Sequence, residues 1–307
     1  MKKTACFYLL IIMGLIVWIS ACKRKTNDLS ALEAQDIVAK ADTQAKAADA
    51  PAGLKIDTIQ KNCFFKASIS RPLYGELSCY AEWPVSLEGT DLSVLQRELL
   101  RKTFGEKEAG DIHVVIEKKF QEYDPTQETR WVRIDKIPKR TEEGFGEDMP
   151  NDEYPFEDSY TRYTVKLDSY QEEAGLIEYS IYVDYNSGML IGPAYGNVFS
   201  HIIFDTKAEK LVRFNDVFVP DARAFLIGKL RRDPVMMEKY ECLWGEDDDM
   251  GISDLPENFL FKNGCIFFVF PKYEAACGSD GSICLGVKLS EVKRYLTSYG
   301  EKLVSSL

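Results

Sequence analysis

The chain has 307 residues, of which 45% are hydrophobic and 12% aromatic, and its formal net charge at pH 7 is −11. This composition supports a sizeable hydrophobic core in one domain or two closely packed halves. The excess of acidic residues argues against nucleic acid as a partner, because affinity for nucleic acid comes largely from neutralising phosphates. Acidity favours solubility and, over long distances, attraction of a basic partner.

The N-terminus has the features of an export signal. Lys2 and Lys3 precede an apolar run over residues 5–17, and small residues stand just before Cys22. A charged start, a short apolar core and a small-residue cleavage site are typical of a secretory signal. The segment Ile19-Ser20-Ala21-Cys22 resembles the lipobox of bacterial lipoproteins. A plain signal peptide and a membrane-spanning signal anchor are the alternatives, since the uncharged stretch approaches the length of a spanning helix.

Lipidation of Cys22 would make this cysteine the new N-terminus and attach the chain to a membrane. Two or more acyl chains, such as palmitate, hold a protein stably, whereas a single chain does not. Lys23, Arg24 and Lys25 would then lie near anionic headgroups. We therefore expect a cell-envelope protein, lipid-anchored to a bacterial membrane on its periplasmic or outer-surface side.

The pattern of residues divides the chain into four regions. We expect a lipoprotein signal peptide over 1–21, a tether over 22–53, an N-terminal α+β half over 54–190 and a C-terminal α+β half over 191–299. The tether is rich in Ala, Lys, Asp and Gln and has no aromatic residue between Lys23 and Gly53, so it lacks the apolar surface for a core.

In the first half, alternating β-branched and aromatic residues predict strands over 54–70 and 77–85, with a turn near 71–75. Apolar residues at helical spacing predict a helix that contains Leu92, Leu95, Leu99 and Leu100 and is capped by Thr90 or Asp91. A second helix is expected over 112–123. The acidic stretch 141–158, broken by Gly and Pro, predicts a solvated loop.

In the second part of the chain, strands are expected over 160–167, 176–185, 259–261, 266–270 and 283–289. Segments 197–205 and 210–214 predict a hairpin, and helices are expected over 221–231 and 290–299. Strands and helices come in runs rather than in strict alternation, which indicates an α+β fold of mainly antiparallel strands with helices packed on them.

Six cysteines remain once Cys6 leaves with the signal and Cys22 takes the lipid. An even number in an oxidising compartment favours disulfides, and Cys63 with Cys79 is the best single pair, since both lie on neighbouring predicted strands. The candidate disulfide cysteines are Cys63, Cys79, Cys242, Cys265, Cys277 and Cys284. Their spacing has no Cys-x-x-Cys pair, so zinc is not expected.

Sequence motifs of catalysis are scarce. His113 lies on a predicted helix and His201 in a predicted strand, without metal-binding spacing, and both are read as structural. No Gly-x-Ser-x-Gly, phosphate-binding or dinucleotide-binding glycine pattern occurs. The acidic run from Glu246 lacks the ligand spacing of a calcium-binding loop. We expect no metal, no cofactor and no catalytic residue; the alternative is a cell-wall hydrolase or deacetylase whose site assembles from scattered carboxylates.

Aromatic residues gather in two segments, one over 179–185 and one over 267–273. Most are expected in the core, because a half-buried strand carries large side chains on its inner face. Exposed tyrosines beside acidic loops are the other interpretation, since tyrosine is enriched at protein interfaces.

The C-terminal part, from Asn258 to Gly281 and from Val287 to Leu296, resembles the extracellular domain of RsiV-type anti-sigma factors, a domain that also accompanies some peptidoglycan deacetylases. Residues 204–218 are similar to an upstream strand, turn and Asp-hydrophobe-Phe segment of the same family. The family has a strand ending in Phe-x-Pro-x-Tyr-Glu, then a glycine-containing turn, another strand and a short helix. The corresponding positions here are Phe270, Pro271, Tyr273, Glu274 and Gly281.

The chain departs from this pattern in places. Phe270 directly precedes Pro271, residues 192–196 replace a Gly-Ala-His segment, and four C-terminal cysteines are unusual for the family. The resemblance implies an α+β ligand-recognition domain outside a membrane; RsiV-type domains bind lysozyme, a basic protein. We therefore expect a non-enzymatic ligand-binding lipoprotein whose partner is a basic protein such as lysozyme, or peptidoglycan. Deacetylase activity is not implied, because no deacetylase domain with its Asp and His ligands is attached.

Overall fold

The computed structural model describes residues 53–67, 73–105, 110–123, 131–137, 159–186, 195–232, 252, 254–271, 274–275 and 282–306. These residues belong to one compact unit, Asp42–Leu307. The expectations for the signal peptide, Cys22, the tether, the acidic stretch 141–158 and the acidic run from Glu246 fall outside the described residues. No helix among the described residues is long and apolar enough to cross a membrane.

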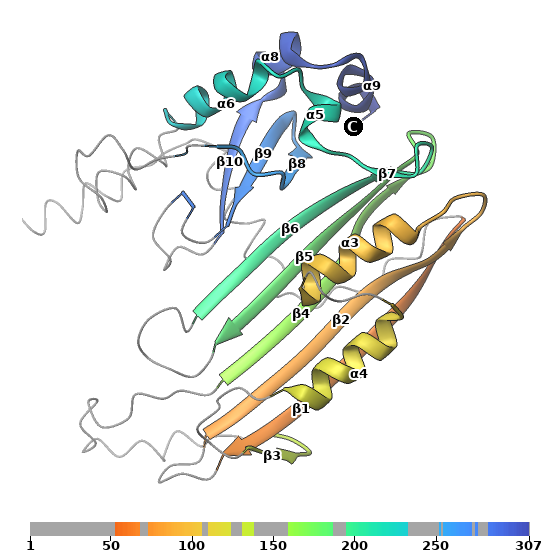
Figure 1. Ribbon diagram of the computed structural model, residues 1–307, viewed down its shortest axis with the longest axis vertical. Helices are drawn as coiled ribbons and strands as arrows, with labels where there is room; N and C mark the ends of the chain where they lie inside the picture. The colour runs from red at the N-terminus through yellow and green to blue at the C-terminus, as the bar shows by residue number, and fades with distance from the viewer. Residues whose placement is uncertain are drawn as a thin grey trace, which may run out of the picture. The chain divides into compact units, whose positions relative to one another are not determined.

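A seven-stranded sheet forms the main structure (Figure 1), with the strand order β3-β1-β2-β4-β5-β6-β7. Neighbouring strands are antiparallel except for the parallel pair β2 and β4. The strands are β1 (Leu54–Ala67), β2 (Leu73–Leu87), β3 (Trp131–Ile134), β4 (Ser159–Gln171), β5 (Leu176–Asn186), β6 (Tyr195–Asp205) and β7 (Lys210–Leu211).

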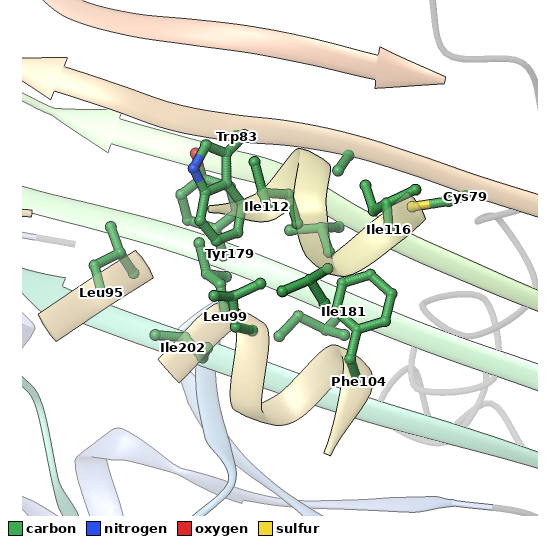
Figure 2. Close-up of a cluster of buried hydrophobic side chains, with 14 of the residues drawn as sticks. Cys79, Trp83, Leu95, Leu99, Phe104, Ile112, Ile116, Tyr179, Ile181 and Ile202 are labelled. Carbon is green, nitrogen blue, oxygen red and sulfur yellow. The ribbon is translucent and has the colours of Figure 1, made fainter. Parts of the chain in front are cut away.

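Two helices, α3 (Ser93–Phe104) and α4 (Ile112–Glu122), pack on one face of this sheet. The Asp111 carboxylate caps α4 by accepting its first amides. The N-cap position of α3 is Leu92, which has no capping side chain, and Asp91 just before it accepts the Ser93 N–H. Figure 2 shows helix residues such as Leu99 and Ile116 meeting Tyr179 and Ile181 of β5. Burial of these apolar side chains is the main force that holds the layers together.

The C-terminal part of the chain adds a three-stranded antiparallel sheet and short helices around a second core. Its strands are β8 (Phe259–Lys262), β9 (Cys265–Phe270) and β10 (Ile283–Lys288), in the order β10-β9-β8. Its helices are α5 (Phe214–Val217), α6 (Ala222–Leu230), α8 (Leu289–Val292), the 3₁₀ helix η4 (Lys293–Tyr295) and α9 (Ser298–Ser306). We call this part the C-terminal module. Leu176 and Ile203 of the large sheet contribute to its core.

One side chain of the C-terminal module hydrogen-bonds to backbone groups at the edge of the large sheet. Beyond the short strand β7, β6 would leave backbone groups without a strand partner. Asn258 accepts the His201 N–H through Oδ1 at 2.8 Å and donates to the Phe199 carbonyl through Nδ2 at 2.8 Å. One amide side chain thus replaces a strand at this position, which protects the edge from pairing with other chains.

The α+β class, the mainly antiparallel pairing and the helices on the sheet are confirmed. Four local expectations differ. The strand expected over 210–214 ends at Leu211, and Phe214 instead begins α5. The short strand β3 was not expected, and Tyr74 and Gly75 belong to β2 rather than to a turn. The helix expected over 290–299 is broken, because Thr297 leaves the helical path to donate its N–H to the Val217 carbonyl and to accept the Gly300 N–H at the start of α9.

The large sheet also continues past residue 190, where a boundary between two halves was expected. β6 pairs along its length with β5, and β7 pairs with β6, so both belong to the same sheet as the earlier strands.

Candidate functional site

The face of the large sheet opposite α3 and α4 carries polar and aromatic side chains. Alternation along β1, β2 and β4 directs every second residue away from the helices. Among the described residues, no helix packs on this part of the sheet. We call this surface the open face, formed by Thr58, Gln60, Asn62, Phe64, Tyr74, Glu76, Ser78, Tyr80, Glu82, Tyr160, Arg162, Thr164 and Lys166.

Arg162 lies at the centre of a charge network on the open face. Its guanidinium donates to Glu76 at 3.2 Å and lies 4.0 Å from the carboxylate of Asp184 on the next strand. It also lies over the ring of Tyr160, 4.5 Å from the ring centroid. The hydrogen bond to Glu76 and the two carboxylates outweigh partial burial and raise the pKa of Arg162. Its side chain is 43% exposed, so a ligand can reach it.

Tyr80 and Glu82 form a second polar pair on the same face. The Tyr80 hydroxyl donates to Glu82 Oε1 at 2.7 Å, and Glu82 Oε2 accepts the Leu167 N–H just beyond the last parallel pair of β2 and β4. Partial burial, together with the hydrogen bond and charge of Glu82, raises the pKa of Tyr80 to about 12. The carboxylate therefore both orients the tyrosine and closes the end of the ladder.

A buried ion cluster lies at the junction between the open face and the C-terminal module. His201 Nδ1 is 3.4 Å from Asp168 Oδ2, and its Nε2 is 3.4 Å from Glu178 Oε2. The His201 side chain is only 5% exposed. Ser180 and Ser169 donate to Asp168 and Glu178.

A bulge in β4 makes this cluster. Leu167 pairs with Tyr179 and Ser169 with Glu178, so Asp168 is the extra residue. A bulge changes the direction of one side chain, and the carboxylate of Asp168 consequently reaches His201 two strands away. Burial disfavours the charged imidazole, but the two nearby carboxylates prevail and raise the pKa of His201 to about 9. The interpretation of His201 as structural agrees with this geometry.

A small cavity lies beside the edge of β6, with a volume of about 20 Å³. Its lining includes Glu98, Lys102, Arg213 and Asn258. Glu98 is buried; Arg101 donates to its two oxygens at 2.8 and 2.7 Å, and Arg213 lies 3.6 Å away. Burial opposes ionisation, but these cations together lower the pKa of Glu98. The space is enough for about one water, so this cavity cannot hold a sugar or a peptide.

The candidate cysteines are placed as follows. Cys63 and Cys79 lie on adjacent strands, but Cys63 is opposite Leu77 and Cys79 is opposite Lys61, so the two are diagonal neighbours. Diagonal Cα atoms are about 7–8 Å apart, beyond the usual reach of a disulfide. Both are buried free thiols, and Cys284 of β10 is a free thiol too. Cys265 begins β9, while Cys242 and Cys277 lie outside the described residues.

Only some of the family-motif positions lie within the described residues. Phe270 is buried at the end of β9, and the Pro271 carbonyl accepts the Glu274 N–H at 3.1 Å. Tyr273 and Gly281 lie outside the described residues. The described motif residues do not converge with the open face, the ion cluster or the cavity, and no group of three His, Cys, Asp or Glu within the described ranges is arranged to hold a metal.

Neither the open face nor the ion cluster was singled out from the sequence. The roles of Arg162, Asp168 and Glu178 depend on the strand order and on the bulge, which bring together residues from three strands. Polar and apolar residues alternate in β5, and this pattern was the sequence signal that could have indicated the polar surface. It places Glu178, Ser180 and Tyr182 on the face opposite the apolar side chains of the strand.

No protein-family model matches the chain, and no curated protein matches it. Solved structures, however, do match the chain. A DUF3298-family protein from Bacteroides fragilis superposes with a TM-score of 0.56 at 16% identity, covering 83% of this chain and 98% of that protein. A DUF3298-family protein from Pseudomonas aeruginosa gives a TM-score of 0.50 at 9% identity, covering 80% and 95%. At such identities the likeness establishes a shared fold. The resemblance to RsiV-type domains stays a prediction.

Proposed function

We propose that the chain is a lipid-anchored protein of the bacterial cell envelope whose folded region binds a ligand without catalysing a reaction. The observation that carries this proposal is the open face, where tyrosines, Arg162 and hydrogen-bonding side chains are presented together on a rigid sheet. Tyrosine and arginine are the residue types most enriched where proteins make contacts. Sites on strands hold side chains more precisely than sites on loops.

The lipobox-like segment ending at Cys22 supports the location of this binding region outside the cytoplasm. The resemblance to RsiV-type domains suggests two ligand classes that are met there, a basic protein such as lysozyme and peptidoglycan itself. The net charge of −11 favours the first by long-range attraction. The mixture of tyrosines and neutral polar groups on the open face favours the second.

The proposal is tested by calorimetry of the full-length protein in detergent micelles with hen lysozyme and, separately, with soluble peptidoglycan fragments. We expect saturable binding to at least one of the two. The open face is checked with Arg162→Ala and with the control Arg294→Ala, a residue of the C-terminal module that stacks on Tyr295. Binding to neither ligand would contradict the proposal.

The hydrolase alternative receives no specific support. It requires two facing acids in a cleft, whereas Asp168 and Glu178 are both committed to His201. It stays a prediction that concerns the acidic segments outside the described residues.

A further inference from the structure

We propose that the open face binds an uncharged, polyhydroxylated chain, the chemistry that a cell-wall glycan presents, rather than a basic protein surface. The inference rests on the proposed function and narrows its ligand. It starts from the carboxylates on and beside the open face, each of which already has a partner within the protein.

The carboxylates on and beside the open face outnumber the cations there, but each of them is already engaged within the protein. Arg162 is shared by Glu76 and Asp184, and the His201 cation is shared by Asp168 and Glu178. The Glu82 carboxylate accepts hydrogen bonds from the Tyr80 hydroxyl and from the Leu167 N–H. A basic partner would have to compete with Arg162 and His201 for four of these carboxylates, and with two hydrogen-bond donors for Glu82. The carboxylates of this surface are therefore less available to a basic partner than carboxylates without internal partners would be.

The remaining groups of the open face suit hydroxyl-rich ligands. One row across the sheet reads Gln60, Tyr80, Thr164 and Tyr182, because these residues are opposite one another on β1, β2, β4 and β5. Amide and hydroxyl side chains both donate and accept hydrogen bonds, as sugar hydroxyls require. Tyrosine provides an apolar ring with a polar tip, and such a ring can pack on the C–H face of a sugar.

The spacing of the two tyrosines in this row fits a repeating ligand. Tyr80 and Tyr182 flank Thr164 and are separated by two strand spacings, about 10 Å in total. That distance approaches the length of one disaccharide. A glycan lying across the strands would thus meet a ring, a hydroxyl and a second ring in succession. Tyr182 is held in place by Phe199, with ring centroids 4.8 Å apart, so this end of the row is preorganised.

The experiment uses the full-length protein in detergent micelles and chitohexaose, an uncharged β-1,4-linked oligomer of N-acetylglucosamine, as the probe. Calorimetry should show binding that Tyr80→Ala weakens by about tenfold. Tyr80→Phe keeps the ring and should bind nearly as well as the unaltered protein. Tyr295→Ala, which removes a tyrosine of the C-terminal module stacked on Phe225, is the matched control. Thermal melting of each variant identifies any loss through misfolding, and Thr164→Ala gives a second test in the same row.

Salt separates the two ligand classes further. Binding of an uncharged glycan should change little when ionic strength is raised, whereas binding of a basic protein by exposed charges should weaken. Chitohexaose that binds Tyr80→Ala as well as the unaltered protein would overturn the assignment to the open face. Binding of lysozyme without binding of chitohexaose would overturn the glycan inference and leave the proposed function standing. Binding of neither lysozyme nor any peptidoglycan fragment would remove both.

Discussion

Gly300 of α9 packs directly against the backbone carbonyl of Val217 in α5. A Cβ added at Gly300 would lie 2.2 Å from that oxygen, which no side chain tolerates. The close approach lets Thr297 bind the end of α5 through its N–H and hydroxyl. The glycine therefore determines how α9 meets the rest of the C-terminal module.

Gly300→Ala should lower the free energy of unfolding by about 1–3 kcal/mol, the usual cost of forcing extra volume into a packed site. Gly228→Ala is the matched control, because Gly228 also lies in a helix but a Cβ there meets nothing within 4 Å. Helix propensity predicts that the control is neutral or stabilising by up to about 1 kcal/mol. Chemical denaturation measures both; equal effects in the two variants would contradict the packing argument.

Stability should fall in alkaline solution through His201. Its pKa is raised from 6.5 to about 9 by Asp168 and Glu178, against the opposing effect of burial. A raised pKa in the folded state stabilises the protein fully below about pH 6.5 and loses that contribution as the pH rises through about 9. The contribution is on the order of 3 kcal/mol at its maximum.

Urea unfolding at pH 6, 8 and 10 should show this loss in the unaltered protein and a flatter pH dependence in His201→Gln. His113→Gln is the control, since His113 is 59% exposed beside Asp57. An unchanged alkaline slope in His201→Gln would show that another group causes the loss.

Cys63 and Cys79 should remain thiols in the folded protein. Burial, weakly opposed by Lys61, raises the pKa of the Cys79 thiol to about 12, and thiols react as thiolates. Alkylation without reductant, followed by mass spectrometry, should label Cys79 slowly in native protein and rapidly after denaturation. A mass shift showing a Cys63–Cys79 disulfide would favour the pairing expected from the sequence.

Replacement of Cys22 by Ser should release the protein from the membrane fraction, because the lipid has no other attachment point in the lipobox-like segment. Cys6→Ser is the control, as Cys6 lies within the signal itself. Fractionation of cells that express each variant gives the answer. Retention of Cys22→Ser in the membrane would favour the signal-anchor alternative.

The helices α3, α4 and α6 and most strands were predictable because local patterns determine them. Ile112, Val115, Ile116 and Phe120 recur at helical spacing, and all four are buried in α4. By contrast, β3 has only four residues at an edge of the sheet and is held by β1. A strand that short carries too little alternation to be recognised without its partner.

The candidate site was harder to predict for a different reason. The partners of Arg162 come from β2 and β5, which flank β4 only because β2 and β4 pair in parallel. The direction of Asp168 depends on one bulge, and a shift of one residue sends a side chain to the other face. Such relationships arise from tertiary structure, and no pattern within a single segment encodes them.

The parallel pair β2–β4 has a consequence for the order in which the chain folds. On either side of it, strands that follow one another closely pair as hairpins, β1 with β2 and β4 with β5 and β6. The parallel pair instead forms only after α3, α4 and β3 have been made, because Ser159, which lies opposite Gly75, follows them in the chain. Pairings distant in sequence form slowly. A chain that is made N-terminus first would therefore hold its first hairpin with an unpaired edge until β4 has been made, and during this interval it most needs protection from aggregation.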